Sequence, residues 1–314
     1  MIKRFYFAAL AAAALVGCNE KMAEMPENAS ESVQLTVSVP VVSTKVMSTP
    51  PEDGVETLQI LVFNEYGLME HTEYKTGSSI TMTCTTGDKT IAAIVNAPKE
   101  TDVLTLDELK ERTFDLNVLT SETLVMFGTK DVTLSANSEV EVPVTRIPAR
   151  VVLSSVTFDL QLAQPEKVSF YINAVYLINV AANASFGGGW TPNDWYHLGR
   201  YNENRTLDFL YDSVAGAAAP TALSDTYETP HYFYCLPNKT ETKTRLVIET
   251  MIAGEIYYYP ITLDKVESNK SYSYNVTLNH LGTDSPDKPL EFGRATFTVD
   301  VKPWEVLDTE DIVL

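Results

Sequence analysis

The residue types that most often carry chemistry are few in this chain and lie far apart. Among its 314 residues are four histidines and three cysteines, and the histidines, at positions 71, 197, 231 and 280, are not clustered as the ligands of a zinc site are. The sequence has no glycine-rich phosphate loop, no His-Glu-x-x-His pair and no Gly-x-Ser-x-Gly elbow. It therefore predicts no enzyme, no metal and no cofactor. A hydrolase is the last alternative, because a catalytic carboxylate pair is made by folding rather than by spacing.

One aromatic segment is a candidate binding surface. Trp190, Trp195 and Tyr196 lie within 184–204, where Gly187 to Gly189 and many polar residues predict a long loop. Aromatic rings beside polar side chains on a loop could stack on a sugar or contact a protein. The alternative is that the rings pin the loop to its own domain.

The first eighteen residues are typical of an export signal. Lys3 and Arg4 precede an apolar run from Phe5 to Val16, which at 12 residues is too short to span a bilayer as a helix. The run is followed by Gly17 and Cys18, and this ending resembles a bacterial lipobox, whose cysteine is acylated and becomes the first mature residue. Acyl chains on Cys18 would hold the protein on a membrane. The alternative is an ordinary signal with a chance cysteine.

The two remaining cysteines, Cys84 and Cys235, are 151 positions apart. We expect two free, buried thiols that pack as small hydrophobic groups. A single long-range disulfide is the alternative in an oxidising compartment.

The charge of the chain excludes one class of partner. Lysine and arginine number 23 against 42 aspartates and glutamates, which gives a formal net charge of −19. Nucleic acids are bound mainly through lysine and arginine, so nucleic-acid binding is not expected as a main role.

The elements that position these residues are mostly strands. Short apolar segments, many of them alternating with period two, predict strands over 33–39, 57–63, 79–85, 90–96, 123–128, 139–144, 150–162, 167–180, 229–235, 244–252, 255–262, 271–279 and 294–301. One helix is predicted after Thr105, which forms a capping box with Glu108, and Leu106, Leu109 and Phe114 are expected on its apolar face. The predicted fold class is all-β, with two β-sandwich domains of transthyretin-like or Greek-key type and a short helix in the first.

Several segments together resemble the fimbrillin family, the shaft subunits of type V pili. They are the lipobox at Cys18, the strand at 33–41 followed by Ser43 to Val46, the strand at 55–67 that ends in a glycine turn, the arginine-containing segment 144–153, and the final strand 295–304 that ends in Trp304. The resemblance covers nearly the whole chain.

The resemblance implies a function without catalysis. In that family a lipoprotein precursor reaches the outer membrane, a protease cuts after a basic residue behind the first strand, and subunits join head-to-tail by donor-strand exchange into an extracellular fimbrium. Here the cut would fall between Lys45 and Val46, because Lys21, the other basic residue between 19 and 57, precedes the strand. The implied partners are copies of the chain or related pilins, the protease, and the membrane that holds the acyl chains.

These expectations divide the chain into five segments. They are the signal peptide 1–18, a propeptide 19–45 with the removable strand, a first sandwich 46–162, a second sandwich 163–304 and a tail 305–314. The tail is the candidate donor strand, through Val306, Leu307, Ile312, Val313 and Leu314. Its alternatives are a disordered end or a last strand of its own domain.

Two other functions stay open at this point. One is an anchor or tip subunit of the same kind of pilus, which would lack the cleavage step or the donor tail. The other is a surface lipoprotein that binds glycans through the aromatic loop.

Overall fold

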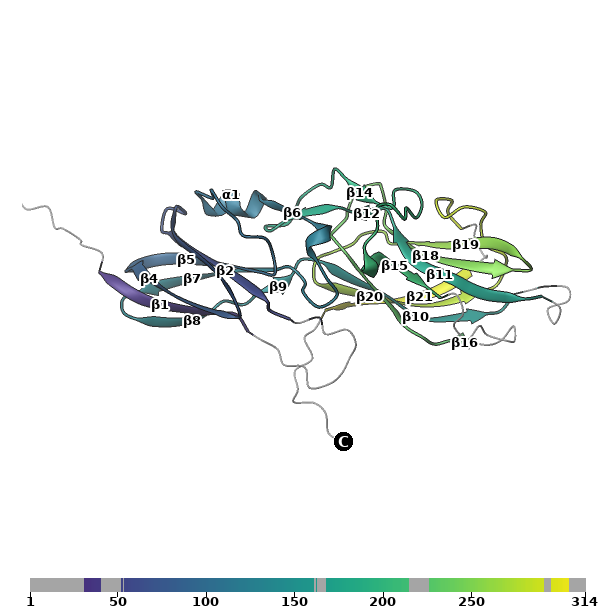
Figure 1. Cartoon of the computed structure of the whole chain (residues 1–314), viewed down its shortest axis with the longest axis horizontal. Helices are drawn as coiled ribbons and strands as arrows, with labels where there is room; N and C mark the ends of the chain where they lie inside the picture. The colour runs from purple at the N-terminus through teal and green to yellow at the C-terminus, as the bar shows by residue number, and fades with distance from the viewer. Residues whose placement is uncertain are drawn as a thin grey trace, which may run out of the picture.

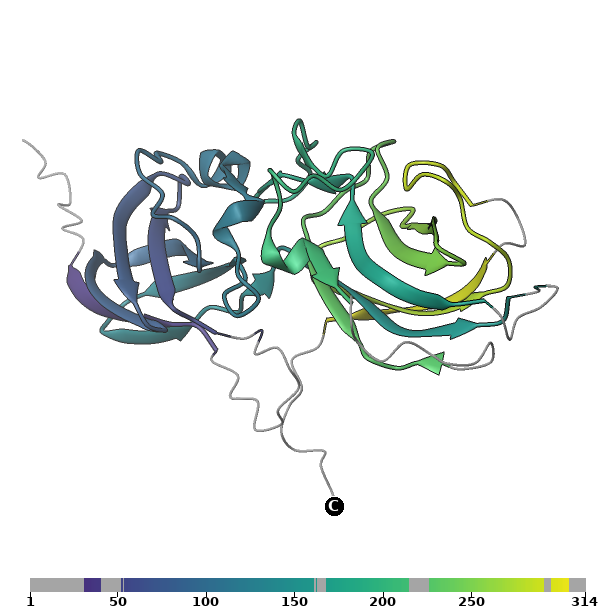
Figure 2. The same ribbon diagram turned by 45° about the vertical axis from the view of Figure 1, so that its right-hand side comes forward.

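The structure, a computed structural model, describes residues 31–40, 52, 54–160, 162, 168–214, 226–290 and 295–304. The molecule is elongated, with strands in both halves, and the short helix α1 (Leu106–Glu111) lies in the N-terminal half (Figure 1). A view turned by 45° shows the same division (Figure 2). The N-terminal half here means β1 to β9, and the C-terminal half means β10 to β21.

The N-terminal half contains two sheets of three and five strands. The three-stranded sheet has the order β4-β1-β8, and the five-stranded sheet has the order β3-β2-β5-β7-β9. The bounds are β1 Ser32–Ser38, β2 Thr57–Asn64, β3 Met69–Thr76, β4 Ser79–Thr85, β5 Gly87–Val95, α1 Leu106–Glu111, β6 Thr113–Asp115, a 3-10 helix Leu116–Val118, β7 Met126–Leu134, β8 Ser138–Glu141 and β9 Thr145–Arg146.

The C-terminal half is built on two sheets of five and four strands. In one, β10 pairs with β16, β17 and β20, and β20 pairs with β21; in the other the order is β15-β11-β18-β19. The bounds are β10 Ala149–Phe158, β11 Phe170–Ile178, β12 Val180–Ala181, β13 Asn183–Ser185, β14 Trp195–Tyr196, a 3-10 helix Asp208–Leu210, β15 Tyr211–Ser213, β16 Thr226–Tyr227, β17 His231–Cys235, β18 Arg245–Ile252, β19 Glu255–Thr262, β20 Lys270–Leu278 and β21 Ala295–Pro303.

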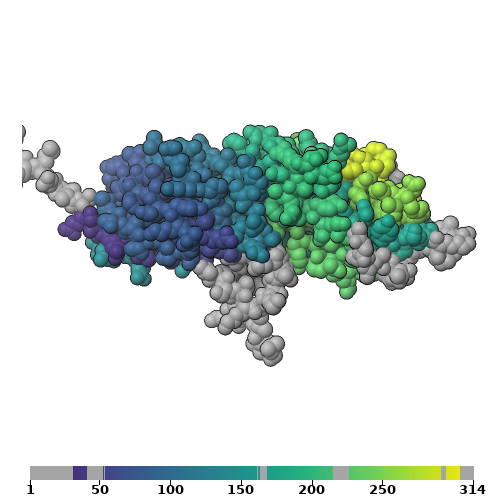
Figure 3. Space-filling view, viewed as in Figure 1, coloured from purple at the N-terminus to yellow at the C-terminus, as the bar shows by residue number. Residues whose placement is uncertain are grey.

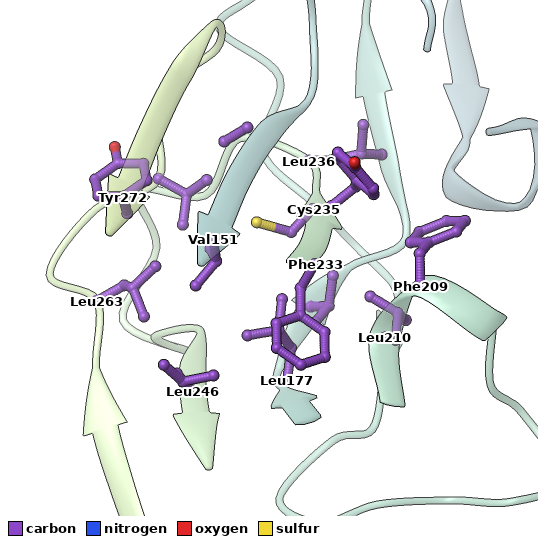
Figure 4. Packing of buried hydrophobic residues seen from close by; sticks show 14 of the residues in the cluster. Val151, Leu177, Phe209, Leu210, Phe233, Cys235, Leu236, Leu246, Leu263 and Tyr272 are labelled. Atoms are coloured by element: carbon purple, nitrogen blue, oxygen red, sulfur yellow. The ribbon is translucent and has the colours of Figure 1, made fainter. Parts of the chain in front are cut away.

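The apolar core runs through both halves. Strand β2 is buried on both faces: Ile60 faces the cluster under β1, while Leu61 and Phe63 join the large cluster that continues into the C-terminal half. This double burial explains why 60–63 is a continuous apolar run instead of an alternating one. The close-up in Figure 4 shows the C-terminal part of that cluster, with Cys235 beside Val151 and Phe233.

The halves are also joined by backbone pairing. Strand β6 pairs antiparallel with β13, so that Phe114 lies opposite Ala184. Next to this pair the rings of Phe114 and Phe186 stack, with their centroids 5.4 Å apart. The predicted place of Phe114 on the helix is therefore wrong: the helix ends at Glu111, and Phe114 is a strand residue of the junction.

The all-β prediction with one short helix is confirmed. The Thr105 side chain accepts a hydrogen bond from the Glu108 backbone N–H at 3.1 Å, as predicted for the cap. Two other expectations differ from the structure. Strand β3 has no counterpart among the predicted strands, and β10 pairs with strands of the C-terminal half, whereas the predicted boundary at 162 assigned it to the first sandwich. We propose a boundary before Ala149.

Candidate functional site

Strand β1 lies between two other strands and is bonded to both. It runs antiparallel to β4, from Val33 opposite Cys84 to Ser38 opposite Ser79. On its other side it runs parallel to β8, from Leu35 opposite Ser138 to Ser38 opposite Glu141. A strand in this position satisfies the backbone groups of both neighbours, so each of them would become an open edge without it.

The inner face of β1 fills the core of the N-terminal half. Val33, Leu35, Val37 and Val39 are all buried, and Leu35 and Val37 are fully enclosed. They pack with residues of β2, β4 and β5 in one apolar cluster. Burying such a side chain contributes about 1.5–3 kcal/mol, so this strand is a large part of the stability of the half. The outer residue Gln34 is exposed, and the strand lies at the surface, purple in Figure 3.

Cys84 lies under the start of β1. It is 6% exposed, and burial is the main cause that raises the pKa of its thiol. Cys235 is fully buried in the other half, where burial raises its thiol pKa to about 12. Both cysteines are free, which confirms the prediction of two buried thiols.

A buried carboxylate connects three distant parts of the chain. Glu52 is 8% exposed. Its Oε1 accepts a hydrogen bond from the Tyr234 hydroxyl at 2.8 Å. Its Oε2 accepts from Arg150 Nη1 at 2.8 Å and from Trp304 Nε1 at 2.9 Å. We call Glu52, Arg146, Arg150, Tyr234 and Trp304 the Glu52 clasp.

The clasp holds Trp304 on several sides. The guanidinium carbons of Arg146 and Arg150 lie 4.8 and 5.1 Å from the centroid of its ring, and Arg146 Nη1 donates to its carbonyl at 3.3 Å. Burial and the Glu52 charge together raise the pKa of Tyr234, which keeps this hydroxyl a donor. Burial lowers the pKa of Arg146, an effect that the Glu52 charge opposes.

The clasp adjoins both predicted processing elements in the sequence. Glu52 follows Lys45 by seven positions, and Trp304 immediately precedes the tail 305–314. Trp304 and the segment around both arginines stand out in the sequence. Glu52 does not, because it lies in a proline-containing stretch with no local signal of burial.

Most of the predicted site residues lie outside the described residues. This holds for the lipidation residue Cys18, the cleavage pair Lys45 and Val46, and the donor candidates Val306, Leu307, Ile312, Val313 and Leu314. They remain predictions.

The aromatic loop does not form the single surface that a sugar platform needs. Trp190 is 40% exposed and lines a pocket of about 680 Å³, with its indole N–H donating to Asn183 at 2.7 Å. Trp195 lines a different pocket. Tyr196 is buried, and the Arg205 guanidinium lies 4.7 Å from its ring centroid. The arrangement fits the alternative in which aromatic residues pin the loop to the protein.

The described residues include no group of three or more His, Cys, Asp or Glu side chains placed to hold a metal ion. In the same part of the chain, no helix has the length and apolar character needed to cross a bilayer.

Several solved structures superpose on this chain, and among them are cell adhesion and fimbrial proteins of bacteria. A candidate cell adhesion protein from Bacteroides eggerthii superposes with a TM-score of 0.68 at 20% identity, covering 88% of this chain and 97% of its own. A fimbrilin from Porphyromonas gingivalis superposes with a TM-score of 0.63 at 15% identity, covering 88% of this chain and 98% of its own. The chain has the fold of a fimbrillin.

The fimbrillin fold is also found in the C-terminally truncated tip fimbrial protein Mfa3 from Porphyromonas gingivalis, with a TM-score of 0.55 at 12% identity over 87% of this chain and all of that one. No known family model matches the sequence, and no curated protein does. At these identities the likeness is one of fold.

Proposed function

We propose that this protein is a structural pilin subunit of a surface fimbrium that serves adhesion, and that it is not an enzyme. The observation that supports the proposal most directly is the position of β1, bonded on both edges between β4 and β8 with its apolar face in the core. The fold shared with a fimbrilin and a tip fimbrial protein supports the same role.

In this proposal the precursor is a lipoprotein, acylated at Cys18 and held on the outer membrane. A protease cuts after Lys45, which releases the lipid together with β1. The subunit then carries a groove between β4 and β8 whose backbone groups and apolar floor need a new strand. A donor strand from another subunit fills the groove, which is strand addition.

Head-to-tail addition of this kind makes an open filament because donor and acceptor lie on different parts of the subunit. The tail 305–314 is the donor that this subunit would offer to the next one. The net charge of the processed chain stays at −19, since cleavage removes four basic and four acidic residues.

The proposal is tested in the producing cell with sheared surface material. We expect the chain in sheared filaments to begin at Val46, and the Lys45→Ala variant to stay cell-bound and absent from filaments. Lys21→Ala is the matched control, because this lysine precedes β1 and its loss leaves the predicted cut intact.

Two results would argue against the shaft role. Incorporation of an uncut chain with acylated Cys18 at the filament base would assign the chain to the anchor. Normal filament length after deletion of 305–314 would show that the tail is not the donor, as expected of a tip subunit.

A further inference from the structure

We infer that the groove under β1 takes a donor strand from a different fimbrial subunit, not the tail of a second copy of this chain. This inference rests on the proposed function, because it names the partner of the same groove. It rests on a comparison between the order of apolar and polar residues in β1, which now fills the groove, and the order in the tail 305–314.

The groove has four consecutive apolar sites. Strand β1 occupies them with Val33, Leu35, Val37 and Val39, which are 6, 0, 0 and 3% exposed. The two central sites are enclosed: opposite Leu35 and Val37 on β4 lie Met82 and Ile80, both buried. A donor strand must therefore place apolar side chains at four alternate positions.

The tail of this chain cannot do so in either register. One set of alternate residues is Val306, Asp308, Glu310, Ile312 and Leu314, and the other is Leu307, Thr309, Asp311 and Val313. Any four consecutive sites would thus receive at most two apolar side chains. In the first set, two carboxylates lie next to each other, so at least one of them always enters a central site.

The groove has little to offer a buried carboxylate. Lys89 is a buried cation in this half, but its ammonium is already paired with Glu70 at 2.7 Å and donates to Thr85 at 2.9 Å. A carboxylate at the site of Leu35 or Val37 would lose its hydration without gaining a hydrogen-bonding or charged partner. This loss strongly disfavours binding of the tail in the groove.

The neighbours of β1 also show which direction reproduces the present pairing. A donor strand that keeps both ladders runs antiparallel to β4 and parallel to β8, as β1 does. The partner is therefore a strand of at least seven residues with small or branched apolar residues at four alternate positions and no charge among them.

Refolding with synthetic peptides tests the inference. The chain without residues 1–18 is cut after Lys45, separated from its 19–45 fragment in urea, and refolded by dilution with a peptide in excess. One peptide has the sequence of residues 31–40 and the other that of 305–314. Protection of the Cys84 thiol from a labelling reagent reports occupancy, and Cys235, at 0% exposure, reports that the rest of the chain is folded.

We expect the 31–40 peptide to protect Cys84 and the tail peptide to protect it at least about tenfold less at equal concentration. A tail peptide with Asp308→Val and Glu310→Val should gain protection, because all five residues of its first set are then apolar and four of them can fill the four sites. A control peptide with Glu305→Gln and Asp311→Asn removes the same number of charges at other positions and should gain little.

Equal protection by the unmodified tail and the 31–40 peptide would overturn the inference and leave the proposed groove intact. Protection by neither peptide, with Cys235 still buried, would overturn the groove itself and the inference with it.

Discussion

At the scale of single residues, Glu52 is a side chain whose loss would break contacts between segments far apart in the sequence. Its carboxylate accepts three hydrogen bonds, from residues 98, 182 and 252 positions away in the sequence. It therefore connects the segment before β2 to β10, β17 and the end of β21.

We expect Glu52→Gln to lower the free energy of unfolding by about 2–3 kcal/mol, because an amide replaces a charged acceptor and leaves Arg150 without its partner. Urea unfolding of the chain without residues 1–18 measures this. The matched control is Glu56→Gln, at an exposed carboxylate, where a change within about 0.5 kcal/mol is expected. Equal effects of the two variants would contradict the role of the clasp.

We expect His197, in the C-terminal half, to make the stability of the protein sensitive to acid. It is 1% exposed, and its Nδ1 donates to the Leu177 carbonyl at 2.7 Å. Its Nε2 is buried with no hydrogen-bond partner among the described residues. Protonation would therefore create a buried, unpaired charge, and burial lowers the pKa of His197 below its ordinary 6.5.

The unfolded chain binds this proton more readily than the folded one. The protonation of His197 therefore costs no stability above pH 6.5, and it lowers the free energy of unfolding as the pH drops below that value. We expect the thermal midpoint of His197→Asn to fall less between pH 7 and 5 than that of the natural chain. Asparagine is chosen because His197 has a φ of 52°, which asparagine tolerates. Parallel pH profiles of the two proteins would show that His197 is not responsible.

At the scale of elements, β1 is a strand that, under the proposed function, stabilises the precursor and is absent from the processed subunit. Leu35→Ala should cost the uncut chain about 2–5 kcal/mol, the usual effect of removing a large buried side chain. Gln34→Ala, at an exposed position of the same strand, should change stability by about 0.5 kcal/mol or less. Denaturant unfolding measures both.

The same two variants separate precursor from filament. Under the proposed function, filaments sheared from cells that express Leu35→Ala should be as stable as natural ones, because the altered strand has been removed. A filament weakened by Leu35→Ala would mean that β1 stays in the assembled subunit.

How far the sequence predicts an element depends on how local its signal is. Strand β1 and the cap at Thr105 were predictable, because alternation and capping involve residues a few positions apart. Strand β3 was missed because its residues Met69–Thr76 are mainly polar and none is buried, so no alternation is visible.

The candidate site was predictable only in part for the same physical reason. The four inner residues of β1 follow from alternation, but its neighbours β4 and β8 are chosen by the fold. The clasp as a whole has no local pattern, since Glu52 and Trp304 are 252 positions apart in the sequence. The aromatic loop was predicted as a surface from composition, which does not show that Tyr196 is buried under Arg205.

At the scale of the whole molecule, the two halves share one core. The large apolar cluster contains Leu61 and Phe63 from β2 as well as Phe233 and Cys235 from β17. Together with the β6–β13 pairing and the Glu52 clasp, this predicts that neither half unfolds alone.

The two cysteines can test this, because Cys84 lies in the first half and Cys235 in the second. We expect their labelling curves against urea concentration to have the same midpoint. A midpoint for Cys84 well below that of Cys235 would show that the N-terminal half opens independently. The labelling pulse must be brief, so that it reports the fraction of molecules with an exposed thiol at each urea concentration and does not shift that fraction.

Strand β1 belongs to the same chain as the groove that it fills, and this has a kinetic consequence for the proposed assembly. While β1 is covalently linked to β2 through fewer than twenty residues, its effective concentration at the groove is on the order of millimolar. A donor strand from outside would compete poorly against that concentration. After a cut, the same strand is an ordinary dilute peptide, and once it has left it rebinds rarely. The timing of growth would then be decided by a single peptide bond, and a cell could accumulate subunits in quantity without any of them joining.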